Sequence, residues 1–176
     1  FDTNPLFLNP VHGPSGVASA AADFTAMVKL TGLEPDTRYY YRVQFVNAFG
    51  RSEPVVGTFR TAPRADQQRP VRFVVGGDLG GQQYCRSADK GGYTIFSAIA
   101  SLGPDFFVAN GDMIYADGDC PEQGPSGWRN IPGDFPSVAS PSVDWTRAEL
   151  VREIFRQHWR YNRADEHFQR LLRVAP

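Results

Sequence analysis

Two apolar segments, each followed by Gly-Asp and joined by a helical pattern, constrain the fold of this chain more than any other feature. Residues 71–76 are rich in β-branched side chains and predict a strand buried on both faces, and residues 105–110 predict a second strand. Between them, residues 93–102 carry apolar side chains at helical spacing, and Gly103-Pro104 is a typical helix stop. The order strand, helix, strand predicts a parallel pair with a right-handed crossover.

An aspartate follows each predicted strand, Asp78 after the first and Asp112 after the second. Because parallel strands share one carboxyl edge, where open α/β sheets bind their ligands, we expect the two carboxylates to lie together. Carboxylates framed by glycine suit calcium, magnesium, manganese or ferric iron. Tyr115 could add a phenolate, a ligand type known for iron. The alternative interpretation is that both aspartates only cap turns.

Other catalytic and binding motifs fit poorly. A dinucleotide-binding fingerprint needs glycine where Asp78 stands, and the Gly-Lys-Ser/Thr of a phosphate loop is missing. None of the three histidines, at positions 12, 158 and 167, stands at the end of a predicted strand, so a hydrolase triad is unsupported. The net charge of −1 leaves no basic excess for binding nucleic acid. No apolar run approaches the roughly 20 residues of a membrane span.

The two cysteines, Cys85 and Cys120, each lie a few residues beyond an acidic turn and are therefore expected near the same sheet edge. A disulfide would suit an exported protein. Reduced thiols, or Cys85 as a metal ligand, are the other interpretations that the spacing allows.

Residues 1–62 are typical of an incomplete all-β sandwich. Residues 22–30 alternate between apolar and polar side chains and predict a strand, as do residues 39–46 and 55–61. Tyr39 follows a Pro-Asp turn and resembles the tyrosine corner of immunoglobulin-like and fibronectin type III sandwiches, in which the hydroxyl bonds back to the preceding turn. We expect this module to be a packing partner, not a ligand-binding unit.

Residues 63–70 are polar, contain two prolines and predict a linker to an α/β region that spans residues 71–176. The long segment 117–143 is rich in Gly, Pro and Ser and predicts a functional loop or lid.

Two helices are predicted after this loop. Thr146 and Glu149 have the spacing of a capping box, with Trp145 and Leu150 as its hydrophobic staple, and an arginine-rich face is expected to be solvated. A shorter helix is predicted over residues 165–173.

The segment Gly-Asp-Met-Ile-Tyr-Ala-Asp-Gly at 111–118 closely resembles the second metal motif of the PhoD-like alkaline phosphatases. These belong to the calcineurin-like metallophosphoesterases and are related to purple acid phosphatases. Residues 76–82 are similar to the first motif of that family, and residues 128–130 and 155–166 look like its following segments. The resemblance implies an α/β fold, the first part of a metallophosphoesterase β-sandwich with flanking helices, preceded by fibronectin-like strands.

Carried over to this sequence, the resemblance implies that Asp78 ligates one metal, Asp112 bridges two and Tyr115 completes an iron centre. Some relatives carry Cys at the position of Asp78. The implied cofactor is a dinuclear or larger centre, Fe(III) with Ca(II) or another divalent ion such as Zn, Mn or Mg. No catalytic residue is assigned beyond the ligands, and Asp117 and Asn130, polar groups near the predicted cleft, receive no role.

The implied activity is hydrolysis of phosphomonoesters, phosphodiesters or phospholipids by a hydroxide held at the metal centre, because relatives include phosphatases, phosphodiesterases and enzymes with phospholipase D activity. The remaining ligands would come from the carboxy-terminal part of the same protein, after Pro176, and the location would be secreted or periplasmic. The alternatives are a non-catalytic sandwich with an α/β binding module, or a nucleotide-binding α/β protein.

Overall fold

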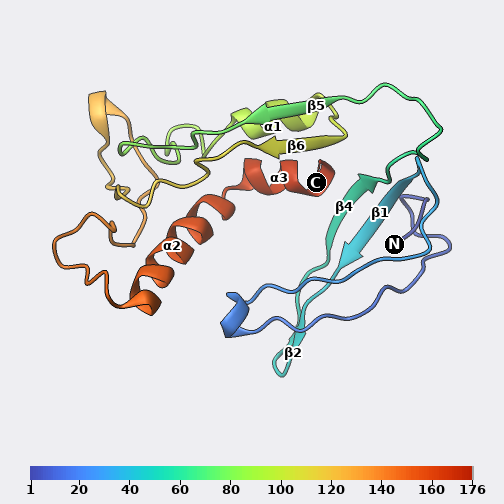
Figure 1. The fold of residues 1–176 in the computed structure, drawn as a ribbon, viewed down its shortest axis with the longest axis horizontal. Coiled ribbons are helices and arrows are strands. Elements are labelled where there is room, and N and C mark those ends of the chain that lie inside the picture. The colour runs from blue at the N-terminus through green and yellow to red at the C-terminus, as the bar shows by residue number, and fades with distance from the viewer. Residues whose placement is uncertain (176) are drawn as a thin grey trace.

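A computed structural model describes residues 1–175, which form an amino-terminal β module beside an α/β region (Figure 1). In the β module, β1 (Arg38–Val43) pairs antiparallel with β4 (Val55–Arg60) over its whole length. Between them, β2 (Val46–Asn47) and β3 (Gly50–Arg51) form a short hairpin. The strands predicted over 39–46 and 55–61 are therefore confirmed in type, with shorter bounds.

The predicted turn contact of Tyr39 is also confirmed, because its hydroxyl accepts a hydrogen bond from the Glu34 backbone N–H at 2.9 Å. The strand predicted over residues 22–30 is wrong. The 3₁₀ turn η1 (Ala20–Ala22) precedes Asp23 and Phe24, whose φ angles are 50° and 55°. The left-handed backbone of these two residues interrupts the extended geometry that a strand needs. Residues 22–30 accordingly form no strand.

The predicted parallel unit is confirmed. β5 (Phe73–Gly76) pairs with β6 (Phe106–Ala109) in parallel, with Gly76 opposite Ala109, and α1 (Ile95–Ser101) makes the crossover. Both strand arrows point toward the long loop of residues 117–143 (Figure 1). In that loop the only regular element is the short 3₁₀ turn η2 (Pro125–Gly127), which agrees with the irregular segment that the sequence predicts.

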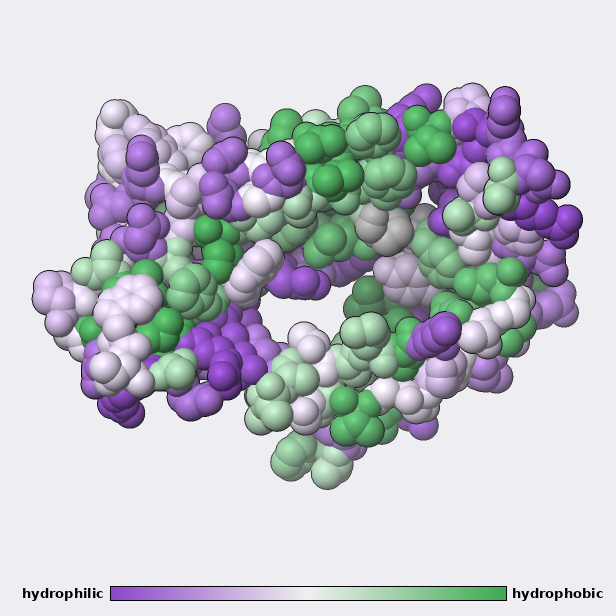
Figure 2. Space-filling view, in the orientation of Figure 1, coloured by the Kyte–Doolittle hydropathy of each residue, from purple (hydrophilic) through white to green (hydrophobic). Residues whose placement is uncertain are grey.

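One face of the β5–β6 pair packs on α1 and on α3 (Glu166–Val174). The Phe96 ring stacks on Phe168 with centroids 4.4 Å apart and meets Phe107 edge-on at 6.0 Å. The opposite face is exposed, so the predicted burial of the first strand on both faces is wrong. Figure 2 shows an apolar surface there, and its residues are Phe73, Val75, Phe106 and Val108. No element among residues 1–175 covers this face, which is why Phe73 and Val75 stay 53% and 52% exposed.

The long helix α2 (Ala148–Arg163) begins without the predicted capping box. The Thr146 hydroxyl donates to Asp144 at 2.7 Å, and Arg147 stands at the cap position without a side-chain cap bond. The staple is wrong as well, because Trp145 is 61% exposed. By contrast, Asp165 caps α3 by accepting from the Phe168 N–H at 3.0 Å. None of the helices in the described part of the chain is long and apolar enough to cross a membrane.

The β module packs directly on the α/β region. A Cβ built on Gly57 of β4 would lie only 2.6 Å from the Arg173 carbonyl oxygen of α3, so the two backbones approach as closely as glycine allows. The Arg156 side chain of α2 donates to the Ala21 carbonyl at 2.9 Å, and Arg160 pairs with Asp23. These contacts fix the module beside both carboxy-terminal helices.

Candidate metal centre

The βαβ unit brings the two predicted aspartates together. Asp78 lies two residues beyond the end of β5, and Asp112 lies three residues beyond the end of β6. The two turns are bonded to each other, because the Leu79 N–H donates to the Asp112 carbonyl at 2.8 Å. Both aspartates have left-handed backbones, with φ of 55° and 48°, a conformation in which Asp is enriched and which recurs at functional sites.

Tyr115 joins the two carboxylates through its phenol. Its hydroxyl lies 2.7 Å from Asp78 Oδ1 and 3.4 Å from Asp112 Oδ2, so it donates mainly to Asp78. The hydrogen bond to Asp78, with the charge of both carboxylates, raises the pKa of Tyr115 to about 12. The ring packs on Gly81, where an added Cβ would lie 3.1 Å from the ring carbons. Glycine at this position therefore leaves room for the phenol.

The site concentrates negative charge without a basic partner. No ion pair formed by residues 1–175 involves Asp78 or Asp112, and Tyr115 is the one donor to either carboxylate in that range. Both aspartates are exposed. Two carboxylates and a phenol form an all-oxygen donor set, which fits hard cations and ferric iron. No group of three or more His, Cys, Asp or Glu side chains with metal-binding geometry occurs among the described residues.

The cysteines lie beside the site but are not ligands. Cys85 and Cys120 form a disulfide with their Cα atoms 5.9 Å apart, which selects the first of the three interpretations that the sequence allowed. The histidines also serve other contacts: His158 lies 3.2 Å from the Pro136 carbonyl, and His167 bonds to the Ser97 hydroxyl at 2.7 Å. Within the described residues the cluster thus consists of Asp78, Asp112 and Tyr115.

Asn130 is the residue near the site whose importance sequence reasoning missed. It is 1% exposed, and its side chain bonds only to backbone groups. Its Oδ1 accepts from the Cys85 N–H at 2.9 Å, and its Nδ2 donates to the carbonyls of Gln83 at 3.0 Å and Pro121 at 2.8 Å. In the sequence, Asn130 is a single polar residue within a long loop. Polar loop residues are usually solvated, so nothing in the sequence indicated that this one is buried.

Comparison with known proteins identifies the family of the chain. Residues 1–63 match the family described as PhoD-like phosphatase, N-terminal domain, and residues 73–176 match the PhoD-like phosphatase family itself. Purple acid phosphatase 13 of Arabidopsis thaliana is 37% identical over 91 residues, which are 51% of this chain and 15% of that protein. The chain thus matches only a small part of this relative, and no solved structure matched it. Because the second family match covers more than half of the chain and includes Asp78, Asp112 and Tyr115, the chain belongs to the PhoD-like phosphatase family.

Proposed function

We propose that this chain is part of a metal-dependent hydrolase of phosphate esters, with Asp78, Asp112 and Tyr115 as its contribution to the metal centre. The observation that carries the proposal is the convergence of two carboxylates, neither of them in an ion pair within residues 1–175, on one phenol at the carboxyl edge of β5 and β6. The match to a phosphatase family and the similarity to a purple acid phosphatase support the same reaction class.

The three residues have distinct roles in this proposal. Asp112 lies in the second turn and would bridge two cations, while Asp78 would bind one of them. Tyr115 keeps its proton at neutral pH in the metal-free site, because its pKa is raised to about 12. As a ligand, Tyr115 would therefore have to give up its phenolic proton. A bound pair of cations would supply Lewis acidity toward the phosphoryl oxygens and a water of lowered pKa.

The metals that suit this donor set are Fe(III) with Ca(II), or with another divalent ion such as Zn, Mn or Mg. A phenolate favours ferric iron, and exposed carboxylates favour calcium or magnesium. Both carboxylates are open to solvent, so a phosphate ester can reach them. This openness is compatible with phosphomonoesters, phosphodiesters and phospholipids.

The rest of the chain supports the site in this proposal. Residues 1–62 form a packing partner of the incomplete fibronectin-like sandwich type, residues 63–70 a linker, and residues 71–176 the amino-terminal part of a metallophosphoesterase catalytic domain. The remaining metal ligands would come from the carboxy-terminal part of the same protein. A disulfide is typical of secreted or periplasmic proteins, so we propose an extracytoplasmic location.

The test uses the full-length protein that contains this chain. We expect bound iron or another cation by elemental analysis, and hydrolysis of p-nitrophenyl phosphate or bis-p-nitrophenyl phosphate that EDTA abolishes and added metal restores. Tyr115→Phe should lower the iron content and remove the visible phenolate-to-iron absorption band. Tyr40→Phe, in β1 and away from the site, is the matched control and should change neither.

Two results would contradict the proposal. A full-length protein without metal and without turnover would favour the non-catalytic binding module. Affinity for a nucleotide that survives EDTA, again without hydrolysis, would favour the nucleotide-binding α/β protein.

A further inference from the structure

The candidate metal centre is built from two loops that have no regular secondary structure of their own. The first loop, residues 77–85, carries Asp78, and the second loop, residues 110–121, carries Asp112 and Tyr115. A polar contact joins them in addition to the bond between their turns, because the Gln83 side chain donates to Asp119 at 2.8 Å. Both ends of that contact are exposed, and exposed polar contacts alone hold a loop weakly.

Asn130 joins the same two loops from a buried position. Through the Cys85 N–H and the Gln83 carbonyl it holds the end of the first loop, and through the Pro121 carbonyl it holds the end of the second. All three bonds are between 2.8 and 3.0 Å long. Its own backbone N–H donates to Glu122 at 2.9 Å, so the residue that makes the connection is itself fixed.

The disulfide makes a second connection between the same loop ends. Cys85, whose N–H binds Asn130, is covalently joined to Cys120, next to Pro121. Both cysteines line a small cavity of about 10 Å³ together with Tyr115, His158 and Tyr161. The disulfide therefore lies close to the Tyr115 ring, whose hydroxyl contacts both carboxylates. A shift of either loop end would move the phenol or Asp78.

We propose that Asn130 is a positioning residue that, together with the Cys85–Cys120 disulfide, sets the separation between Asp78 and Tyr115 and thereby the cation affinity of the site. This inference rests on the proposed function, because it concerns affinity for a bound cation. Residues that hydrogen-bond directly to metal ligands typically change metal affinity or activity by about 10–100-fold when removed, and we expect an effect of that order here because Asn130 holds the ends of both ligand-bearing loops. Asn130 touches neither carboxylate nor the phenol, so its effect would pass entirely through the backbone.

The experiment measures binding of Mn²⁺ alone to the metal-stripped full-length protein, with free Mn²⁺ followed by electron paramagnetic resonance. Asn130→Ala should weaken binding by about 10–100-fold at a temperature well below its unfolding midpoint. Arg129→Ala is the matched control, because Arg129 is the preceding residue and its side chain pairs only with Asp89 on the surface. We expect Arg129→Ala to bind Mn²⁺ like the wild type.

A purely structural role would lower the unfolding midpoint of Asn130→Ala and leave the affinity of the folded protein unchanged, and that result would overturn the inference. Equal weakening by Arg129→Ala would overturn it too. If Asn130→Ala does not fold, the Cys85→Ala/Cys120→Ala double variant gives the answer: severalfold weaker binding supports the inference, and unchanged binding overturns it. A wild-type protein that binds no Mn²⁺, iron or calcium would instead overturn the proposed function, and this inference with it.

Discussion

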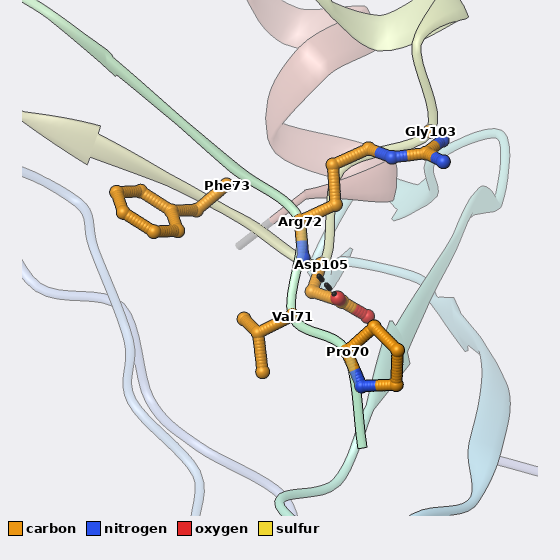
Figure 3. A pocket seen from close by; sticks show the side chains of 6 residues that line it. All are labelled: Pro70, Val71, Arg72, Phe73, Gly103 and Asp105. Atoms are coloured by element: carbon orange, nitrogen blue, oxygen red, sulfur yellow. Dashed lines mark hydrogen bonds between the residues drawn. The ribbon is translucent and has the colours of Figure 1, made fainter.

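Aspartates lie at both edges of the β5–β6 pair, but within residues 1–175 only the aspartate at the amino edge pairs with a basic side chain. At the amino edge, Asp105 lies 3.1 Å from the Arg69 guanidinium and accepts the Arg72 N–H at 2.9 Å. Both contacts lower the pKa of Asp105, the Arg69 guanidinium most of all. Asp105 and Arg72 line a pocket of about 480 Å³, and Figure 3 shows their side chains with the other lining residues. Arg69 also reaches Asp36 of the β module at 2.9 Å, so this edge joins the two parts of the chain.

At the carboxyl edge, Asp78 and Asp112 have no such partner among residues 1–175, and they share the proton of Tyr115. Nearby His158 does not supply a positive charge either, because burial lowers its pKa. The contrast teaches how to separate structural from functional carboxylates. Where basic groups of the chain neutralise an aspartate, it supports the fold. Where none is supplied, as at Asp78 and Asp112 within residues 1–175, the carboxylates are free to bind a cation, which is the role that we propose for them.

The largest expected effect is on cation binding. Asp112→Ala should weaken cation binding of the full-length protein by more than about 100-fold, beyond the usual loss for residues behind the ligands, and should abolish hydrolysis of p-nitrophenyl phosphate. Asp105→Asn removes a carboxylate from the other edge of the same sheet and should leave both properties at wild-type level. Elemental analysis and turnover assays measure both. Loss of metal in Asp105→Asn, or its retention in Asp112→Ala, would contradict the division between the edges.

The second expected effect is on stability at the carboxyl edge. The Cys85–Cys120 disulfide closes a loop of 35 residues, and the chain-entropy relation assigns about 4 kcal/mol of folding stability to such a loop. The Cys85→Ser/Cys120→Ser variant should therefore unfold at clearly lower urea concentration than the wild type. The reduced wild-type protein should match the variant. Equal midpoints would mean that the hydrogen bonds of Asn130 already hold the loop ends.

The third expected effect is on stability at the amino edge. Asp105→Asn should cost about 1–2 kcal/mol of unfolding free energy, because it removes a charge-assisted hydrogen bond in a mostly covered position. The folded state lowers the pKa of Asp105, so its stabilisation is complete above the unfolded pKa of about 3.9 and is lost as pH falls toward the folded value. The difference between wild type and variant, measured by urea unfolding, should shrink between pH 6 and pH 3. A constant difference would show that the charge is not responsible.

The sequence predicted the βαβ unit well because its signals are local and strong. Apolar runs mark β5 and β6, Gly103-Pro104 marks the end of the crossover, and chain geometry alone then places Asp78 near Asp112. The sequence-based prediction failed where a side chain had a competing hydrogen-bond partner nearby. Thr146 has the spacing of a cap, yet its hydroxyl donates to Asp144, and the helix starts elsewhere.

Long-range partners were beyond the reach of the sequence. Residues 22–30 alternate between apolar and polar side chains like a strand. Alternation alone does not form a strand, because a strand also needs a neighbouring strand to pair with, and the pattern does not show whether one is present. Asn130 looks like an ordinary loop residue, and its value comes from backbone groups 9 to 47 residues away. The disulfide stayed one of three interpretations for the same reason, since sequence spacing cannot give the distance between two loop ends.

The smallest expected effect concerns the pH dependence of stability behind the carboxyl edge. His158 packs on the Phe135 ring at 4.1 Å, and burial lowers its pKa below the ordinary 6.5. As pH falls below about 6.5, the unfolded chain takes up a proton at His158 before the folded protein does, so unfolding becomes easier. His158→Gln can keep a hydrogen bond to the Pro136 carbonyl and cannot titrate, so its stability should fall less than that of the wild type between pH 7 and pH 5. Urea unfolding across this range measures the difference.

If wild type instead gained stability relative to His158→Gln on acidification, the folded site would be stabilising a charged imidazole. The carboxyl edge would then have a cation of its own, and the contrast with the Asp105 edge would fail.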